Sequence, residues 1–204
     1  MIVDTAAIAS GYNLLDHQKR GYLLSALHKT RPDGFTLIEL MITIAIFSIT
    51  LTFGVSSYRT WVLGSQIRNA AESIQNGIQR ARAEAVKCNA KVAFTLGAAS
   101  AWSVIHVDAC GTLAAGNVLE TRTSGEGSKN VTITATPAGA TTITFSSLGT
   151  VVASAATLSQ VDLDSSVASS GARNLRVAIG LGGDPRVCDP NLNPATSTDP
   201  RRCY

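Results

Sequence analysis

The stretch Arg31-Pro-Asp-Gly-Phe-Thr-Leu-Ile-Glu-Leu40 joins a basic, turn-prone segment directly to an apolar run from Phe35 to Val55. A run of about 20 apolar residues is long enough to span a bilayer as a helix. One carboxylate, Glu39, lies inside this run. An ionisable side chain in such a helix costs roughly 2.5–3.5 kcal/mol to insert, so it usually marks a function. The simplest alternative is a signal anchor that tolerates a glutamate close to the membrane surface.

The residues on either side of Glu39 resemble the type IV prepilin signature. In that family a prepilin peptidase cuts after a glycine and methylates the new N-terminal phenylalanine, and a glutamate stands at the fifth mature position. The resemblance places the cut between Gly34 and Phe35 and makes Glu39 that glutamate. It implies a pilin, a minor pilin or a type II secretion pseudopilin, with prepilin peptidase and other pilins as partners.

The charges before the apolar run predict the orientation of the chain. Basic residues stay on the cytoplasmic side, so the helix leaves the inner membrane outwards and the rest of the chain is translocated. We expect a prepilin leader over 1–34, which is long for this family and would be shortened by a start downstream of Met1. A transmembrane assembly helix over 35–60 and a periplasmic or extracellular globular domain over 61–204 then follow. The expected location is the bacterial inner membrane, and later the cell surface within the pilus.

The composition suits one membrane helix and one modest globular domain. Removing residues 1–34 from the 204 of the chain leaves 170, which is enough for a single small core. Aromatic residues make up only 5%, whereas Ala, Ser, Thr and Gly are abundant, which favours a small-residue β domain over a large enzyme core. The net charge of +3 is too small to imply nucleic-acid binding by itself.

Four cysteines lie after the membrane helix, in the oxidising compartment: Cys88, Cys110, Cys188 and Cys203. An even number there predicts two disulfides, for which three pairings exist. We favour Cys88–Cys110 and Cys188–Cys203, because each closes a short local loop. The spacings fit no zinc pattern, and the mature chain has a single histidine, His106, so we expect no metal site and no cofactor.

The periodicity changes from helical to strand-like along the chain. Small and apolar residues recur on one helix face between Ser65 and Lys87, namely Ile67, Ala71, Ile74, Ile78, Ala81 and Ala85. Gly54, Gly64 and Gly77 are candidate points of flexure along the long helix. Strands are expected at Lys91–Leu96, Trp102–Val107, Val118–Thr121, Val131–Thr134, Thr142–Phe145 and Leu175–Ile179, with a weaker one at Thr157–Leu163. The predicted fold class is α+β: one long N-terminal helix, half transmembrane and half amphipathic, whose second half packs on an antiparallel sheet. A disulfide closes the irregular tail that begins at Gly180.

Beyond the leader, the chain is similar to the GspH/FimT group of minor pilins and pseudopilins. The similarity lies in Ile78–Val86 at the helix end, in Phe145-Ser-Ser-Leu-Gly-Thr150 and in Leu175-Arg-Val-Ala-Ile-Gly180. That group often has a final strand, a Gly-x-x-Arg turn and a strand that ends in cysteine. Gly183-Asp-Pro-Arg186 keeps the ends of this turn and lacks a basic residue at its start. The resemblance implies the type IV pilin fold and a FimT/FimU-like minor pilin.

Three functions remain open on these grounds. The first is a minor pilin near the pilus tip that primes assembly for twitching motility and adhesion, with Glu39 neutralising the Phe35 amine of a neighbouring subunit. The second is a minor pilin that binds DNA for uptake in natural transformation, because clustered arginines neutralise phosphates. The arginines in question are Arg173, Arg176, Arg186, Arg201 and Arg202, and a solvated basic surface partly paired with aspartates is the simpler interpretation of them. The third is a type II secretion pseudopilin of the GspH type.

We expect no enzymatic activity and no small-molecule substrate. Ser103 and His106 lie on one predicted strand, where neighbouring residues point to alternate faces, and no Gly-x-Ser-x-Gly motif accompanies them. An exposed or hydrogen-bonded strand histidine is therefore the preferred interpretation of His106. Asp162 and Asp164 share a strand face, but two carboxylates alone make a poor cation site.

Overall fold

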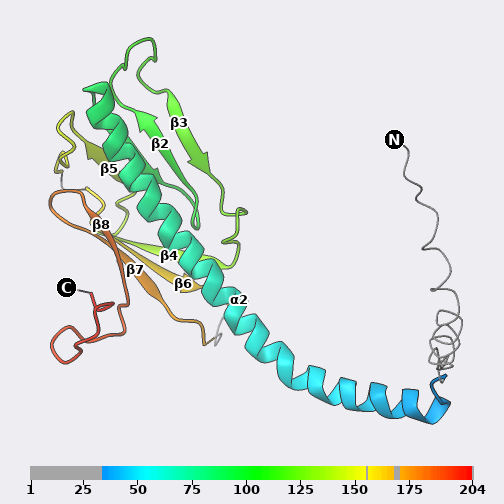
Figure 1. Ribbon diagram of the computed structural model, residues 1–204. Helices are drawn as coiled ribbons and strands as arrows, with labels where there is room; N and C mark the ends of the chain where they lie inside the picture. Colours follow the sequence, from blue (N-terminus) through cyan, green and yellow to red (C-terminus); the bar gives the residue numbers. More distant parts are fainter. Residues whose placement is uncertain (1–33, 155, 168–170, 204) are drawn as a thin grey trace, which may run out of the picture. The chain divides into compact units, whose positions relative to one another are not determined.

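The computed structural model describes residues 34–154, 156–167 and 171–203. The chain divides into two compact units, residues 1–49 and 50–204. Helix α2, Leu37–Cys88, spans 52 residues and so contributes to both units (Figure 1). The expected leader lies outside the described residues apart from Gly34, whereas the expected long helix is present.

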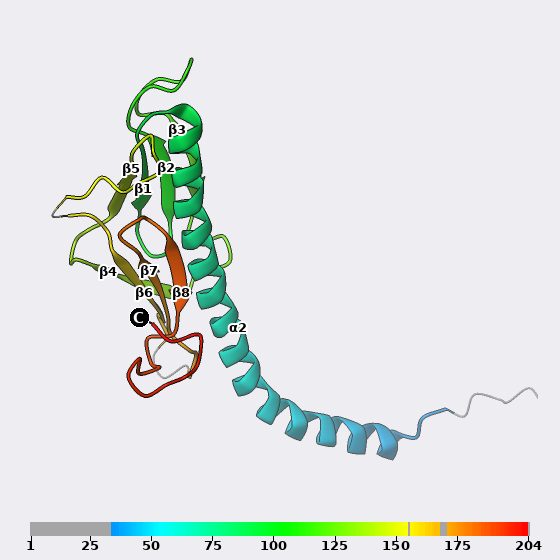
Figure 2. The ribbon, with the colours of Figure 1, turned by 60° about the vertical axis from the view of Figure 1, so that its left-hand side comes forward.

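Two four-stranded antiparallel sheets make up the rest of the second unit. The first has the order β3-β2-β1-β5, with β1 at Val92–Leu96, β2 at Trp102–His106, β3 at Val118–Arg122 and β5 at Thr142–Phe145. The second has the order β4-β6-β7-β8, with β4 at Val131–Thr136, β6 at Gln160–Ser165, β7 at Leu175–Ile179 and β8 at Pro185–Cys188. The second half of α2 runs along one side of the strands of both sheets (Figures 1 and 2).

The core forms where the small-residue face of α2 meets both sheets. All six residues of the predicted helix face are fully buried, which confirms that face. The first sheet adds Val92, Phe94, Val104, Ile143 and Phe145 to one continuous cluster, and the second adds Val131, Val161, Leu163 and Val177. Burying one helix stripe against inward-facing strand residues is the usual way in which a helix stabilises a sheet.

Gly77 is a point of close approach between the helix and the first sheet. A Cβ atom there would lie 2.8 Å from Phe94 Cε2 and 3.1 Å from the Trp102 ring. The two rings are 5.7 Å apart between centroids, and the Trp102 indole N–H donates a buried 2.7 Å hydrogen bond to Ser73 Oγ. The absence of a side chain at Gly77 therefore lets the tryptophan settle against the helix.

The expectation of one sheet is incorrect in detail, because the strands divide into two. Thr157–Ser159, which was predicted to begin a strand, instead links the sheets. The Leu158 amide donates to the Thr142 carbonyl of β5, and the Ser159 amide donates to the Thr136 carbonyl of β4. The strand itself begins later, at Gln160.

Strand β8 was not predicted from periodicity, although the family resemblance implied a strand that ends in cysteine. It is short, it begins with a proline, and it pairs with β7 at the edge of the second sheet. An edge strand needs hydrogen-bonding groups on one side only, so it tolerates a proline that a central strand would not.

Candidate functional site

The start of α2 is fixed by the residues of the predicted cleavage junction. The Glu39 amide donates a 3.2 Å hydrogen bond to Thr36 Oγ1, and the Leu40 amide donates to the Thr36 carbonyl. Thr36 thus caps the helix in the pattern Thr-x-x-Glu, which is a recognised helix-start signature. A cut between Gly34 and Phe35 would leave the new amine just outside the first helical turn.

Phe35 and Glu39 are both exposed, and 83% of Phe35 is accessible. Within the described part of the chain, the Glu39 carboxylate takes part in no hydrogen bond or ion pair. A carboxylate in the first turn of a helix is favourably placed against the helix dipole.

The first part of α2 presents apolar side chains that nothing in the described chain covers. Twelve large apolar residues between Phe35 and Val55 are each about half exposed or more, whereas Leu63 is the first buried one among the helix residues whose burial the structure describes. Among the described residues no single helix qualifies as a membrane span, but the parts Leu37–Thr52 and Ser57–Cys88 qualify together by length and composition.

Polar side chains inside this apolar part are satisfied by the helix itself. The Thr43 hydroxyl donates a 2.8 Å hydrogen bond to the Leu40 carbonyl, and the Ser48 hydroxyl donates a 2.7 Å bond to the Ile44 carbonyl. Such bonds remove the cost of placing a hydroxyl in an apolar environment. Glu39 differs from these hydroxyls, because its carboxylate has no partner among the described residues.

The structure contains two disulfides. Cys88 at the end of α2 is joined to Cys110 in the loop after β2, and Cys188 at the end of β8 is joined to Cys203 near the C-terminus. These are the two local pairings that we favoured among the three. The second closes a loop of 15 residues in sequence separation, for which chain-entropy arguments assign about 3 kcal/mol of stabilisation.

The five arginines predicted for nucleic-acid binding make contacts within the protein. Arg176 on β7 forms a bidentate ion pair with Asp162 on β6, at 2.6 and 3.2 Å. Asp162, one of the two aspartates that share a strand face, is therefore the partner of an arginine. Arg173 Nε lies 3.4 Å from the buried carboxylate of Asp189.

The other three arginines hold the disulfide-closed loop. Arg186 donates to the Pro200 carbonyl at 3.2 Å, and Arg202 donates to the Ser197 carbonyl. Arg201 donates to both oxygens of Asp199, at 3.0 and 2.6 Å. The segment from Gly180 to the C-terminus contains three arginines and three aspartates. Its side chains therefore carry no net positive charge that would attract phosphates.

The Asp199–Arg201 pair has an electrostatic consequence. Hydrogen bonds from the Arg201 side chain and amide lower the pKa of Asp199 from 3.8 to about 2, because they stabilise the ionised carboxylate. The same contact raises the pKa of Arg201. The loop is therefore held by a charged pair throughout the physiological pH range.

His106 differs from its prediction as an exposed or hydrogen-bonded histidine. It is fully buried, and neither ring nitrogen has a hydrogen-bond partner among the described residues. Glu84, Cys88 and Cys110 surround it. The expectation of no metal site rested on linear spacing, and this cluster is one that linear spacing does not reveal.

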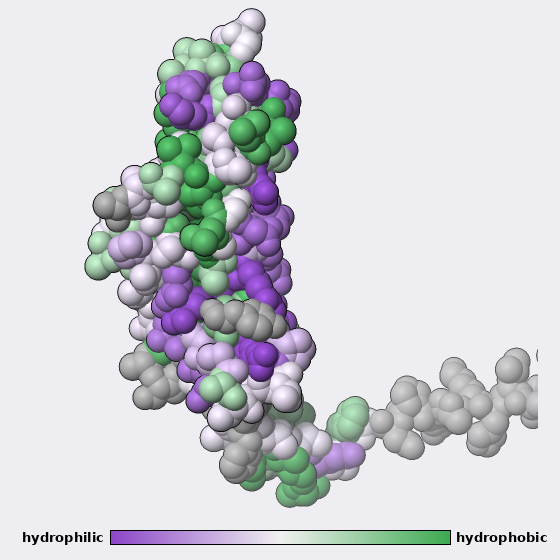
Figure 3. Space-filling view, turned by 90° about the vertical axis from the view of Figure 1, so that its left-hand side faces the viewer, coloured by the Kyte–Doolittle hydropathy of each residue, from purple (hydrophilic) through white to green (hydrophobic). Residues whose placement is uncertain are grey.

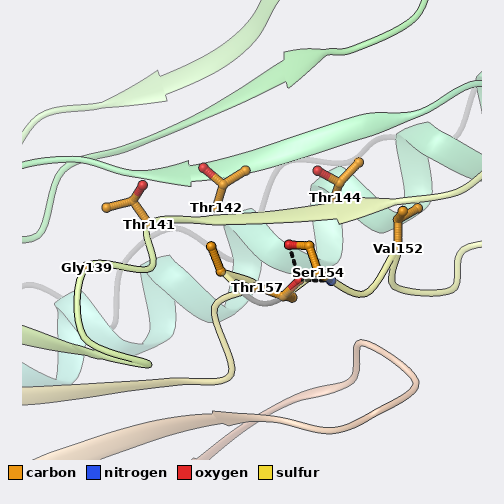
Figure 4. A pocket seen from close by; sticks show the side chains of 8 residues that line it. Gly139, Thr141, Thr142, Thr144, Val152, Ser154 and Thr157 are labelled. Atoms are coloured by element: carbon orange, nitrogen blue, oxygen red, sulfur yellow. Dashed lines mark hydrogen bonds between the residues drawn. The ribbon is translucent and has the colours of Figure 1, made fainter.

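A shallow groove of about 210 Å³ lies beside β5 (Figure 4). Its lining consists of small and hydroxyl-bearing residues: Gly139, Thr141, Thr142, Thr144, Val152, Ser154, Ala156 and Thr157. The Ser154 and Thr157 hydroxyls, which lie side by side on one loop of the groove, are hydrogen-bonded to each other at 3.0 Å. None of these lining residues is titratable, so the groove offers no acid, base or metal ligand.

An exposed apolar helix that begins at a cleavage-type junction and continues along a disulfide-closed β domain defines a type IV pilin-like protein. A model described as the prokaryotic N-terminal methylation motif matches residues 30–55. The family model described as Type II transport protein GspH matches residues 70–183, which is more than half of the chain, so this protein belongs to that family.

The solved structures include a similar protein, the type IV minor pilin FimU of Pseudomonas aeruginosa. One crystal form is 20% identical, with a TM-score of 0.40, and the match covers 68% of this chain and 95% of that chain. A second form is 18% identical, with the same TM-score, and the match covers 67% and 99%. No curated protein sequence that was compared matches the chain.

Proposed function

We propose that this protein is a minor pilin of a type IV pilus, which prepilin peptidase cuts between Gly34 and Phe35 and methylates at Phe35. The product is anchored in the inner membrane by the first part of α2 and then enters the pilus near its tip, where it primes assembly. The observation that carries this proposal is the junction itself: a capped helix start and an exposed Phe35 at the head of an exposed apolar helix, with a Glu39 carboxylate that has no partner among the described residues.

Glu39 gives the proposal its mechanism. In an apolar surrounding, a carboxylate and the amine of a neighbouring subunit are each costly alone and compensate each other when paired. Removing one partner of such a buried pair costs roughly 3–5 kcal/mol, because the other charge is left uncompensated. The pairing therefore fixes the stagger between adjacent helices as subunits enter the filament.

Exposed apolar residues on the β domain provide further surface for neighbouring subunits. Leu148 and Leu181 are 82% and 103% accessible and sit on two turns that contact the last part of α2, at Val86 and Arg82 respectively. Figure 3 shows that hydrophobic residues also gather in the upper half of one face of the molecule, bordered by hydrophilic ones. A subunit that packs against others is expected to carry such patches.

The test compares Glu39→Gln with Glu72→Gln in the native host. Both changes remove one exposed carboxylate from α2, but only the first removes the charge from the apolar part. We expect both proteins to be processed and inserted into the membrane, and only the Glu39→Gln protein to be missing from sheared pili. Equal incorporation of the two variants would refute the proposed pairing.

The family description favours a second candidate, a type II secretion pseudopilin of the GspH type. The same junction and helix would serve it, since pseudopilins assemble by the same helix packing. Deleting the gene separates the two: a pilus subunit is needed for surface pili, and a pseudopilin is needed for release of secreted proteins. DNA uptake by the arginine set receives no comparable support, because those side chains are engaged within the domain.

A further inference from the structure

Four metal-ligating side chains meet where the end of α2 touches the first sheet. Glu84 and Cys88 stand one turn apart on α2, His106 ends β2, and Cys110 follows in the next loop. A ring nitrogen of His106 and the sulfurs of Cys88 and Cys110 all lie within 4.8 Å of one another. Glu84 Oε1 is 3.4 Å from Cys88 Sγ and 4.0 Å from His106 Nε2.

His106 has no hydrogen-bond partner among the described residues while Cys88 and Cys110 form a disulfide. Its ring is fully buried, and both nitrogens lack a hydrogen bond among the described residues. A buried polar group without a hydrogen bond is costly, and a disulfide sulfur has no proton to donate and is a weak acceptor. The packing thus directs an unsatisfied imidazole at two sulfur atoms, which is the arrangement of a ligand set rather than of a core histidine.

Once the disulfide is reduced, these side chains match the ligands that Zn²⁺ prefers. Two thiolates, one imidazole and one carboxylate make four donors, the number that a tetrahedral zinc site takes. Neighbouring donors around a tetrahedral zinc lie roughly 3.3–3.8 Å apart. The distances between the donors are close enough to these values for side-chain rotation to complete the geometry.

Charge and access also suit a divalent cation. Two thiolates and the Glu84 carboxylate supply three negative charges, which Zn²⁺ and the Lys87 ammonium, 3.1 Å from Glu84, would balance. Cys88 and Cys110 are only partly buried, which leaves a path for the ion from solvent.

We propose that the reduced form of this protein binds one Zn²⁺ ion through Cys88, Cys110 and His106, with Glu84 as the fourth ligand. A dithiol reductant gives two electrons and two protons to the Cys88–Cys110 disulfide, which becomes two thiols, and the reductant itself becomes a disulfide. Zn²⁺ then displaces the protons of the two thiols to solvent. A disulfide oxidant reverses this by taking two electrons from the thiolates, which re-forms Cys88–Cys110 and releases the ion. Metal and disulfide are alternative ways of fastening the end of α2 to the loop after β2.

The test uses the full chain in detergent, reduced under anaerobic conditions and titrated with Co²⁺, a spectroscopic substitute for Zn²⁺. We expect tetrahedral d–d bands and a sulfur-to-cobalt charge-transfer band that saturate at one equivalent and disappear on addition of Zn²⁺. The unreduced protein should give neither. Zn²⁺ should also raise the melting temperature of the reduced protein and leave that of the oxidised protein unchanged.

Matched variants separate this site from thiols in general. Cys188→Ser with Cys203→Ser should keep the bands, and Cys88→Ser with Cys110→Ser should lose them. His106→Gln should weaken binding more than about 100-fold, since even a partner of a ligand is typically worth 10–100-fold. If this variant does not fold in its oxidised form, Glu84→Gln serves instead, with a loss of about 10-fold or more and an altered d–d spectrum.

Three results would each overturn the proposal: no binding to the reduced protein, bands without sulfur-to-cobalt charge transfer, or affinity unchanged in the folded histidine or glutamate variant. The last would mean that the metal is held by thiols of an unfolded chain. Minor-pilin function does not enter this test, so its outcome leaves the proposed function untouched.

Discussion

Replacing Gly183 with alanine tests how much the packing of the β7–β8 turn against the first sheet contributes to stability. Gly183 is buried with a φ of +79°, in a turn closed by hydrogen bonds from its own amide to the Gly180 carbonyl and from the Gly180 amide to the Asp184 carbonyl. A Cβ atom there would lie 2.4 Å from Phe145 Cε1 and 2.8 Å from Val151 Cγ2. Phe145 ends β5 in the other sheet and is fully buried, so it has little room to retreat.

Two penalties combine at this position. A left-handed backbone costs an alanine roughly 1–2 kcal/mol, and forcing a methyl group into a packed core typically costs about 1–3 kcal/mol. Gly183→Ala should therefore lower the free energy of unfolding by roughly 2–5 kcal/mol. For a domain of this size that corresponds to a fall in melting temperature of about 4–20 °C.

Gly182 provides the control one residue away. Nothing lies within 4 Å of a Cβ atom built there, so Gly182→Ala should change stability by less than about 0.5 kcal/mol. The assay is thermal unfolding of the full chain in detergent, followed by circular dichroism with both disulfides intact. If the two variants melt within about 2 °C of each other, the packing of Gly183 against Phe145 and Val151 does not contribute the expected stability.

Three further expectations concern processing, helix packing and the C-terminal loop. Gly34→Val should leave the chain at precursor size in an immunoblot, because the proposed cut follows this glycine, and a product of mature size would contradict this. Gly77→Ala should destabilise the domain by about 1–3 kcal/mol in the same melting assay, because the new methyl group clashes with two aromatic rings. Its control, Gly64→Ala, places a methyl group with nothing within 4 Å and should stabilise the domain by up to about 1 kcal/mol. The carboxyl pKa of Asp199, about 2, lies below its unfolded value of 3.8, so its contribution is present above pH 4 and is lost as the pH falls through 2. Arg201→Gln should return that pKa toward 3.8 in an NMR titration, and an unchanged value would exclude the pair as the cause.

Local patterns were sufficient for the parts of the fold that depend on local chemistry. The burial of Ile67, Ile74 and Ile78 follows from helical spacing alone, and β5 and β7 have the predicted bounds. The cap formed by Thr36 is also a local feature, because Thr-x-x-Glu at a helix start is a sequence signature of capping.

What the sequence did not reveal depends on which distant residues meet. Strand periodicity says which face is buried but not which strand is the neighbour, so the division into two sheets and the link at Leu158 were missed. Gly77 looked like any helix-weakening glycine, because the rings that require its small size are distant in sequence. His106 and Glu84 lie 22 residues apart in sequence and become neighbours only when β2 packs beside the end of α2.

The two halves of α2 need different surroundings, and Glu39 affects which surroundings the first half prefers. The twelve exposed apolar side chains between Phe35 and Val55 would forgo roughly 10–20 kcal/mol of burial if left in water, which is as large as the whole stability of a typical domain. That segment therefore needs a cover at every stage, whether lipid or other helices. For leucine and isoleucine the free energy of burial is nearly the same in lipid as among helices, since lipid tails are as apolar as the side chains themselves. The two surroundings differ for a carboxylate, because lipid tails offer no cation and a bundle of helices with free amines at their ends does. Under the proposed function, the Glu39 charge at the head of the helix is thus enough to make the bundle the favoured surrounding.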